Sequence, residues 1–222
     1  MTKPIARGVF LVGGPGLSDE KDASVYLVDG GTAAALIDGG AGEGTDKIIK
    51  NIERAGVDPA RVKYLILTHC HIDHSGGAAG LRERLALKIV AHQRGAEILA
   101  IPDDPRAAAA WYGMSLPAMT VDLPFDAEEY RLPLGDTELT CLYIPGHSPD
   151  SICVYLDRDR ERILFGQDVH GPIHPVLASN RELWQKSLQR LLALKADVLC
   201  EGHFGIYRPA DEAAEYIRSY LD

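Results

Sequence analysis

The order of apolar and polar positions predicts strands and helices that follow one another along the whole chain. Short apolar or alternating runs, bounded by glycine, proline and aspartate, are typical of strands. They cover residues 9–12, 24–28, 33–37, 64–68, 88–91, 138–144, 151–156, 162–165 and 197–200. Apolar positions three and four residues apart predict helices over residues 45–55, 75–85, 93–100, 181–194 and 209–221. Glycine-rich turns between the first three strands indicate an antiparallel start.

Each half of the chain has strands first and strand–helix units after them, with no linker between the halves. Two sheets packed face to face, with helices outside, fit this order in one domain over residues 1–222. Residues 101–127 are irregular and rich in proline. They are either a functional insertion or lid, or a short helix with loops that covers one sheet edge.

Composition narrows the classes of partner. The 222 residues carry a formal charge of −9, which argues against nucleic acid as a general partner. No apolar run reaches the roughly 18 residues of a membrane span. The N-terminal residues show no signal-peptide pattern, and the four cysteines form no Cys-x-x-Cys pair. We therefore expect reduced thiols in a cytoplasmic protein, and we leave open assembly as a homodimer.

Residues 69–74 place four potential metal ligands within six positions. They are His69, His71, Asp73 and His74, and they follow the predicted strand at 64–68. Open α/β sheets have their functional sites at such strand ends. Cys70 alternates with the ligands and is expected to point away from them.

Three further candidate ligands follow predicted strands, each after a glycine: His147, Asp168 and His203. Imidazole and carboxylate without thiolate suit zinc, and also iron or manganese. The complete set is too large for one tetrahedral ion. It suits two ions that share one ligand and leave positions open for water, an arrangement used in hydrolysis.

The motif His-x-His-x-Asp-His, followed by these three residues in order, resembles the metallo-β-lactamase superfamily. In layout it is most similar to the glyoxalase II-like hydrolases. The resemblance covers nearly the whole chain and includes Leu-Ile-Asp-Gly-Gly at residues 36–40, which matches an early strand and turn of that family. It implies an α/β fold of the αββα sandwich type.

The resemblance also implies roles for single residues. One Zn²⁺ would be held by His69, His71 and His147. The other would be held by Asp73, His74 and His203. Asp168 and a hydroxide would bridge the two ions, Asp73 would orient the hydroxide, and Asp38 would orient the metal loop. Asp38 as an ordinary turn residue is the alternative.

The implied reaction is attack of the bridging hydroxide on a small thioester, ester or lactone. The resemblance is to a short form without the helical C-terminal region that binds glutathione. A second hypothesis is an oxidoreductase similar to the persulfide dioxygenases, with one iron ion on the equivalents of His69, His147 and Asp168. Candidate pocket residues are Tyr112, His170 and Tyr207. Asp150, beside His147, either disfavours anionic substrates or caps the next strand.

Overall fold

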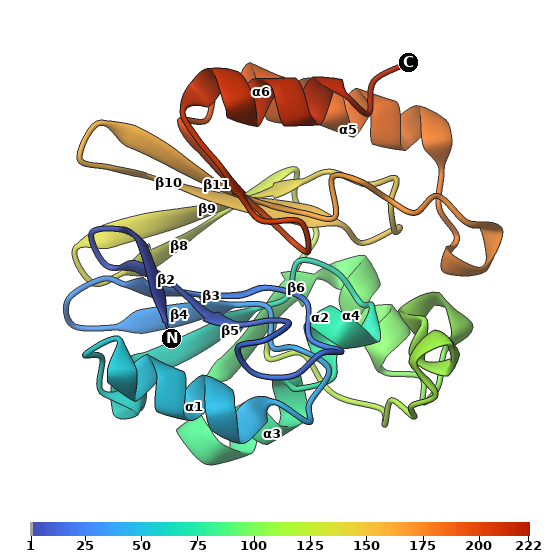
Figure 1. Ribbon diagram of the computed structural model, residues 1–222. Helices are drawn as coiled ribbons and strands as arrows, with labels where there is room; N and C mark the ends of the chain where they lie inside the picture. Colours follow the sequence, from blue (N-terminus) through green and yellow to red (C-terminus); the bar gives the residue numbers. More distant parts are fainter. Residues whose placement is uncertain (1) are drawn as a thin grey trace.

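Two β-sheets lie face to face in the computed structural model, which describes residues 2–222 (Figure 1). The first sheet has the order β1 (Lys3–Ala6), β2 (Val9–Gly13), β3 (Val25–Asp29), β4 (Ala34–Ile37), β5 (Val62–Ile66), β6 (Lys88–His92) and β7 (Leu123–Phe125). The second has the order β13 (Ile206–Tyr207), β12 (Val198–Glu201), β11 (Glu161–Gln167), β10 (Ile152–Arg158), β9 (Thr137–Tyr143) and β8 (Glu129–Leu134).

Both sheets are mixed. Strands β1 to β4 pair antiparallel, as the turn pattern predicts, and β4 to β7 pair parallel. In the second sheet β8 to β11 are antiparallel, β12 is parallel to β11, and β13 is antiparallel to β12. The ends of β4, β5, β11 and β12 consequently meet at one end of the sandwich.

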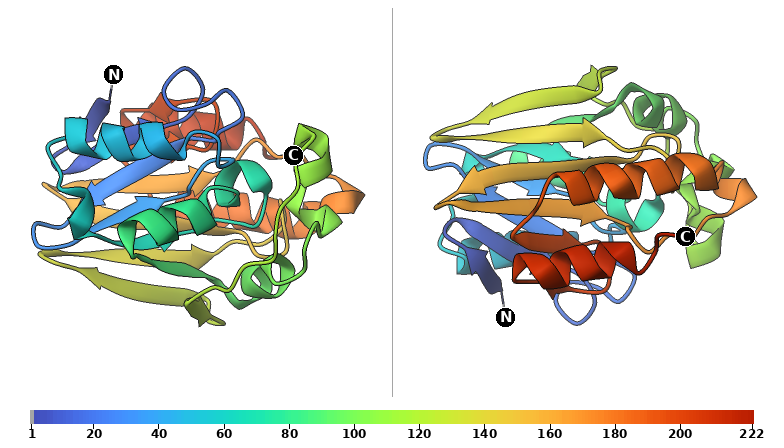
Figure 2. Two further views of the ribbon diagram at one scale, coloured as in Figure 1. Left: turned by 90° about the horizontal axis from the view of Figure 1, so that it is seen from below. Right: turned by 90° about the horizontal axis from the view of Figure 1, so that it is seen from above.

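Helices cover the outer face of each sheet (Figure 2). The first sheet carries α1 (Thr45–Arg54), α3 (Ala78–Leu85) and α4 (Gln93–Leu99), and the second carries α5 (Arg181–Ala193) and α6 (Ala210–Arg218). The shorter elements are α2 (Ile72–Ser75), η1 (Pro59–Arg61), η2 (Pro105–Ala107), η3 (Ala109–Tyr112) and η4 (Pro175–Leu177). The αββα sandwich expected from the sequence is confirmed.

Strand alternation builds the apolar layers of the sandwich. In β4, Leu36 packs into the layer beneath the outer helices, whereas Ile37 packs between the sheets. Leu65 and Ile66 repeat this division in β5. Both faces of these central strands are buried, which explains their continuous apolar sequence. Burial of each such side chain stabilises the fold by about 1.5–3 kcal/mol.

The structure corrects several predicted boundaries. Strand β5 ends at Ile66, two residues before the end predicted at residue 68. The helix predicted over residues 75–85 begins at Ala78. Asp73 and His74 lie in the short helix α2 and not in a loop. Strands β1, β7, β8 and β13 were not predicted. The segment 101–127 contains η2, η3 and strand β7, which pairs with β6.

All four cysteines are buried and unpaired in the structure. Across the described residues, no helix combines the length and the apolar character needed to cross a bilayer.

Candidate metal centre and its cavity

The seven ligands predicted from the sequence converge at one end of the sandwich. Two groups form there, the first of His69, His71, His147 and Asp168, and the second of Asp73, His74 and His203. The ligand atoms within each group lie within 4.8 Å of one another. The loop after β5 and helix α2 supply one side of the centre, and the loops after β9, β11 and β12 supply the other.

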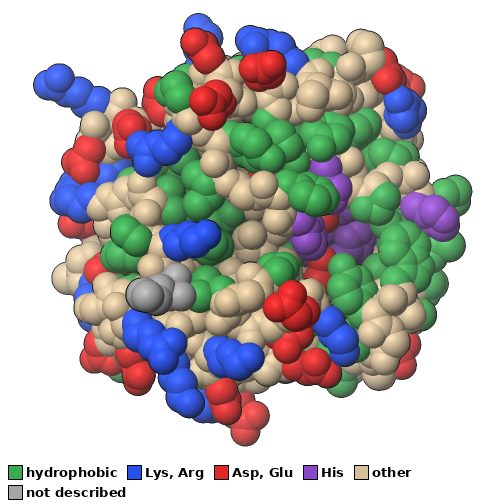
Figure 3. Space-filling model, in the orientation of Figure 1, with side chains coloured by type: hydrophobic (Ala, Val, Ile, Leu, Met, Phe, Trp, Pro, Cys, Tyr) green, Lys and Arg blue, Asp and Glu red, His purple; other side chains and the backbone are tan. Residues whose placement is uncertain are grey.

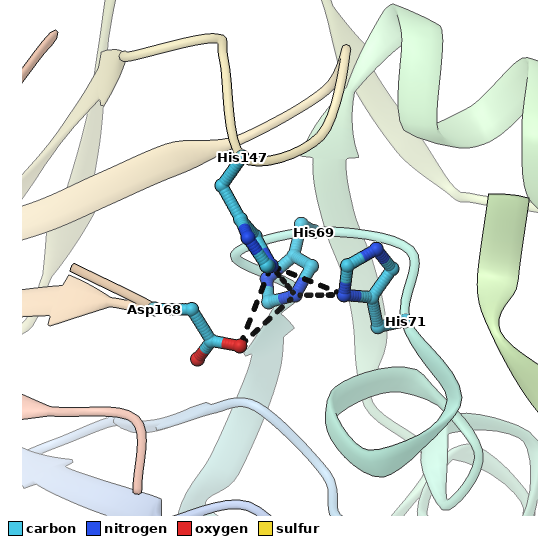
Figure 4. A group of neighbouring side chains, drawn as sticks. All are labelled: His69, His71, His147 and Asp168. Atoms are coloured by element: carbon cyan, nitrogen blue, oxygen red, sulfur yellow. Dashed lines mark hydrogen bonds and ion pairs between the residues drawn. The ribbon is translucent and has the colours of Figure 1, made fainter. Parts of the chain in front are cut away.

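In the first group, three imidazole nitrogens face one another (Figure 4). His69 Nε2 lies 2.9 Å from His71 Nδ1, and His147 Nε2 lies 3.1 Å from His71 Nδ1 and 3.3 Å from His69 Nε2. The Oδ2 atom of Asp168 is 3.4 Å from His147 Nε2 and 3.8 Å from His69 Nε2.

In the second group, the other oxygen of the same aspartate is the common contact. Asp168 Oδ1 is 3.2 Å from His74 Nε2 and 3.4 Å from His203 Nε2. Asp73 Oδ2 is 3.2 Å from His203 Nε2 and 3.7 Å from His74 Nε2. Asp168 therefore faces both groups, with one oxygen toward each.

These distances fit divalent cations. Ligand atoms held about 2.0–2.1 Å from a tetrahedral zinc ion lie about 3.4 Å from one another. His74 Nε2 and Asp168 Oδ1 are buried, face each other and have no hydrogen-bond partner among the described residues. Such groups are costly to bury unless something binds them, and a cation satisfies both.

Asp38 orients one histidine in each group. Its Oδ2 accepts hydrogen bonds from Thr68 Oγ1 at 2.8 Å and from His74 Nδ1 at 2.7 Å, and its Oδ1 accepts from the Thr68 amide at 2.8 Å. Thr68 Oγ1 lies 3.1 Å from His69 Nδ1 and can accept that proton. Both imidazoles then keep Nε2 free toward the centre, which is the form a metal ligand needs.

The backbone orients a third histidine in the same way. His147 Nδ1 lies 3.0 Å from the carbonyl oxygen of Pro172, so its proton points there and Nε2 points into the centre. Gly202 is constrained by the site, because a Cβ atom at this position would overlap Asp168 Oδ1. A glycine just before His203 is therefore required by the packing of the shared carboxylate.

Burial keeps His69 and His71 of the first group neutral. It lowers the pKa of His71 to about 3 and the pKa of His69 well below its usual value, and neighbouring histidines reinforce the effect. A histidine must be unprotonated to bind a metal. These two side chains are therefore in the ligand form at neutral pH.

The second group has the opposite balance. Burial alone lowers the pKa of His74, but nearby carboxylates, chiefly Asp168, raise it well above its usual value. Burial likewise lowers the pKa of His203, while its close contacts with the Asp168 and Asp73 carboxylates outweigh burial and raise the pKa to about 10. Cation binding at this group must displace protons from the imidazoles.

A cavity of about 430 Å³ opens over the centre, within the range of small-molecule sites. It is lined by Pro15, His71, Asp73, Ala108, Trp111, Tyr112, Asp168, His170, Pro172, Leu177, His203 and Phe204. Figure 3 shows hydrophobic side chains gathered around the histidines on this face. Tyr112 and His170 line the cavity, as the sequence predicts.

The prediction that Tyr207 lines the pocket is wrong. Its ring stacks on Tyr216 of α6, with centroids 3.9 Å apart, and it is absent from the cavity wall. Asp150 is also absent from the wall, so it does not face a substrate there. It is 3% exposed and accepts a hydrogen bond from Ser148 Oγ at 2.7 Å, within the loop that holds His147.

Several residues at the site were not predicted from the sequence. Glu201 is fully buried, and its carboxylate accepts hydrogen bonds from the amides of His203 and Phe204 and contacts His170 Nδ1 at 2.8 Å. Thr68 and Phe204 were missed as well. Each directly adjoins a predicted ligand, and that adjacency is the only signal that could have found them.

The fold is a two-sheet sandwich with two groups of candidate metal ligands at one end. The sequence profile of the metallo-beta-lactamase superfamily matches residues 19–203. The chain therefore belongs to the metallo-beta-lactamase superfamily.

Curated relatives are similar along most of this chain. The acyl-coenzyme A thioesterase MBLAC2 of Gallus gallus is 29% identical, and the match covers 92% of this chain and 80% of that protein. The acyl-coenzyme A thioesterase MBLAC2 of Homo sapiens is 30% identical, over 75% of this chain and 65% of that protein. The thioesterase pkgB of Emericella nidulans is 29% identical, over 87% of this chain but only 49% of that protein.

A solved structure shares the fold. A mutant of the metallo-beta-lactamase from Cronobacter sakazakii superposes with a TM-score of 0.79 and 22% identity, over 99% of this chain and 93% of that chain. At this level of identity, the likeness concerns the architecture alone.

Proposed function

We propose that this protein is a metal-dependent hydrolase of thioesters that uses two divalent cations, zinc in the first instance. The observation that carries the proposal is the placement of Asp168, whose two oxygens face separate ligand groups at the base of an open cavity. The relatives named as thioesterases support thioesters as the substrate, in preference to esters and lactones.

The cations would be held by the seven residues of the two groups. Cations in such a site supply Lewis acidity and lower the pKa of coordinated water. The chain itself orients the ligands: Asp38 fixes His74 directly and His69 through Thr68. Asp73 Oδ2 accepts a hydrogen bond from Tyr112 Oη at 2.8 Å, which holds this carboxylate at the cavity wall.

The cavity wall favours water as the nucleophile. Among the described residues that line it, there is no serine, threonine or cysteine. Burial and the Asp73 carboxylate raise the pKa of Tyr112, so its hydroxyl stays protonated and acts as a hydrogen-bond donor. A thiol has a pKa of about 8.5, so a thiolate leaves without strong acid assistance. A site without a strong acid for the leaving group therefore favours a thioester substrate over an amide.

Metal removal should abolish hydrolysis. The purified protein should contain two ions per chain, and dialysis against a chelator should remove activity toward thioesters, with recovery on adding Zn²⁺.

His71→Ala removes a buried ligand of the first group and should lower kcat/KM by more than about 100-fold, since losing even an outer partner of a ligand costs 10–100-fold in metal affinity. Elemental analysis and assays on thioesters, esters, lactones and persulfides measure both effects.

Two outcomes would contradict the proposal. Full activity in His71→Ala would exclude the metal mechanism. One iron per chain, with oxygen uptake on a persulfide and no hydrolysis, would support the oxidoreductase hypothesis instead.

Tyr112→Phe tests the hydroxyl that holds Asp73. The substitution keeps the ring and removes one hydrogen bond to a ligand of the second group. We expect affinity for the second cation to fall about 10-fold, with the first unchanged, because a partner of a ligand has been lost. A zinc titration followed by calorimetry measures this. Tyr130→Phe in β8 is the matched control and should bind both ions normally.

A further inference from the structure

The walls of the cavity differ in chemistry from its base. The base consists of the candidate ligands, and much of the remaining wall is apolar: Pro15, Ala108, Trp111, Pro172, Leu177 and Phe204. Trp111 is 51% exposed and Phe204 is 62% exposed. Large apolar rings left in water beside a site commonly mark a surface that binds a ligand.

Each ring contacts a histidine beside the cavity. Trp111, in η3, makes an edge-to-face contact with His174, with centroids 5.2 Å apart. Phe204, which follows β12, makes a similar contact with His170 at 4.6 Å. The two aromatic rings thus belong to separate segments, and packing orients each of them next to the same cavity.

Apart from the candidate ligands, the wall carries no cationic side chain of the lysine or arginine type among the described residues. The phosphates of a nucleotide carrier or the carboxylates of a peptide carrier would find no lysine or arginine partner on that wall. The apolar part of the wall therefore offers nothing to the charged groups of a carrier, whereas an uncharged chain can replace water against it.

We propose that this cavity selects thioesters by an apolar, uncharged acyl chain that packs against Trp111 and Phe204, with little contribution from the thiol carrier. The proposal rests on the hydrolase function proposed above. It makes Trp111 and Phe204 specificity-determining residues and leaves the metal ligands to the reaction.

Acyl-chain length provides the test in the zinc-loaded protein. The probes are N-acetylcysteamine thioesters of acetate, butyrate, hexanoate and octanoate, with coenzyme A thioesters of the same acids. We expect kcat/KM to rise up to about fourfold per methylene until the cavity is filled. Trp111→Ala and Phe204→Ala should each lower kcat/KM for octanoyl about tenfold and change it less than about twofold for acetyl. The control Leu183→Ala, at a 41% exposed leucine outside the cavity wall, should change neither.

A binding measurement separates this proposal from the proposed function. S-octyl-N-acetylcysteamine, a thioether that cannot be hydrolysed, should change the fluorescence of Trp111 in the metal-free protein, and Trp111→Phe should abolish that change. Absence of all hydrolysis would overturn the function, while thioether binding would still support the apolar site. Hydrolysis without dependence on chain length, or with a strong salt-sensitive preference for coenzyme A thioesters, would overturn the inference alone.

Discussion

Asp168→Asn should remove both bound cations and nearly all hydrolysis. Each carboxylate oxygen faces a different ligand group, 3.4 Å from His147 Nε2 on one side and 3.2 Å from His74 Nε2 on the other. The asparagine amide keeps the shape of the carboxylate but loses its negative charge, and the amide nitrogen cannot coordinate a metal ion. Because the loss of an outer partner already costs about 10–100-fold in metal affinity, the loss of this shared ligand should cost more than about 100-fold. Metal content after dialysis and kcat/KM for a thioester measure the effect.

Asp211→Asn, at an exposed carboxylate in the first turn of α6, is the matched control and should keep two ions. Unfolding of the metal-free proteins distinguishes a lost ligand from a lost fold. If Asp168→Asn retained one tightly bound ion with unchanged turnover, the shared role of this aspartate would be disproved.

The central strands could be predicted because both of their faces are buried, as Leu36 and Ile37 illustrate. The missed strands β1, β7, β8 and β13 are all edge strands of their sheets. Three of them contain proline, at Pro4, Pro124 and Pro133. Proline is tolerated at an edge because one side of the strand needs no amide donor, yet in the sequence it argues against a strand. The fourth, β13, has only two residues and gives no periodic signal.

The convergence of the candidate ligands could be predicted because they follow strands, and strand ends meet where the sandwich opens. The cavity wall could not be predicted, because separate loops form it. Tyr207 shows the limit: it lies four residues from His203, but β13 turns back along β12, and the ring packs against Tyr216 of α6. Phe204 adjoins the same ligand and does line the cavity. Distance along the chain does not determine which face a side chain reaches.

Asp38→Asn should weaken binding of the cation held by the second group more than binding of the cation held by the first, because Asp38 contacts His74 directly and His69 only through Thr68. Asp38 has φ +63°, a left-handed conformation that asparagine also tolerates, so the substitution isolates the chemistry of the side chain. If the new amide oxygen accepts from the Thr68 amide, its NH₂ faces His74 Nδ1 in place of a carboxylate. His74 must then accept at Nδ1 and carry its proton on Nε2, the atom that faces Asp168. Such a loss of tautomer control should reduce affinity for the second cation about 10–100-fold.

Thr68→Val is the matched variant, because it removes the hydroxyl between Asp38 and His69 and leaves the Thr68 amide and the bond to His74 in place. It should lower the affinity for the cation held by the first group and leave the affinity for the cation held by the second group unchanged. Alanine at position 38 is a poorer probe, since it would leave the buried Thr68 amide without its partner at a cost of about 1–3 kcal/mol. Zinc titrations resolve the two binding steps in each variant. Equal loss at both steps in Asp38→Asn and Thr68→Val would show that the aspartate holds the loop as a whole and does not set the proton position of each histidine.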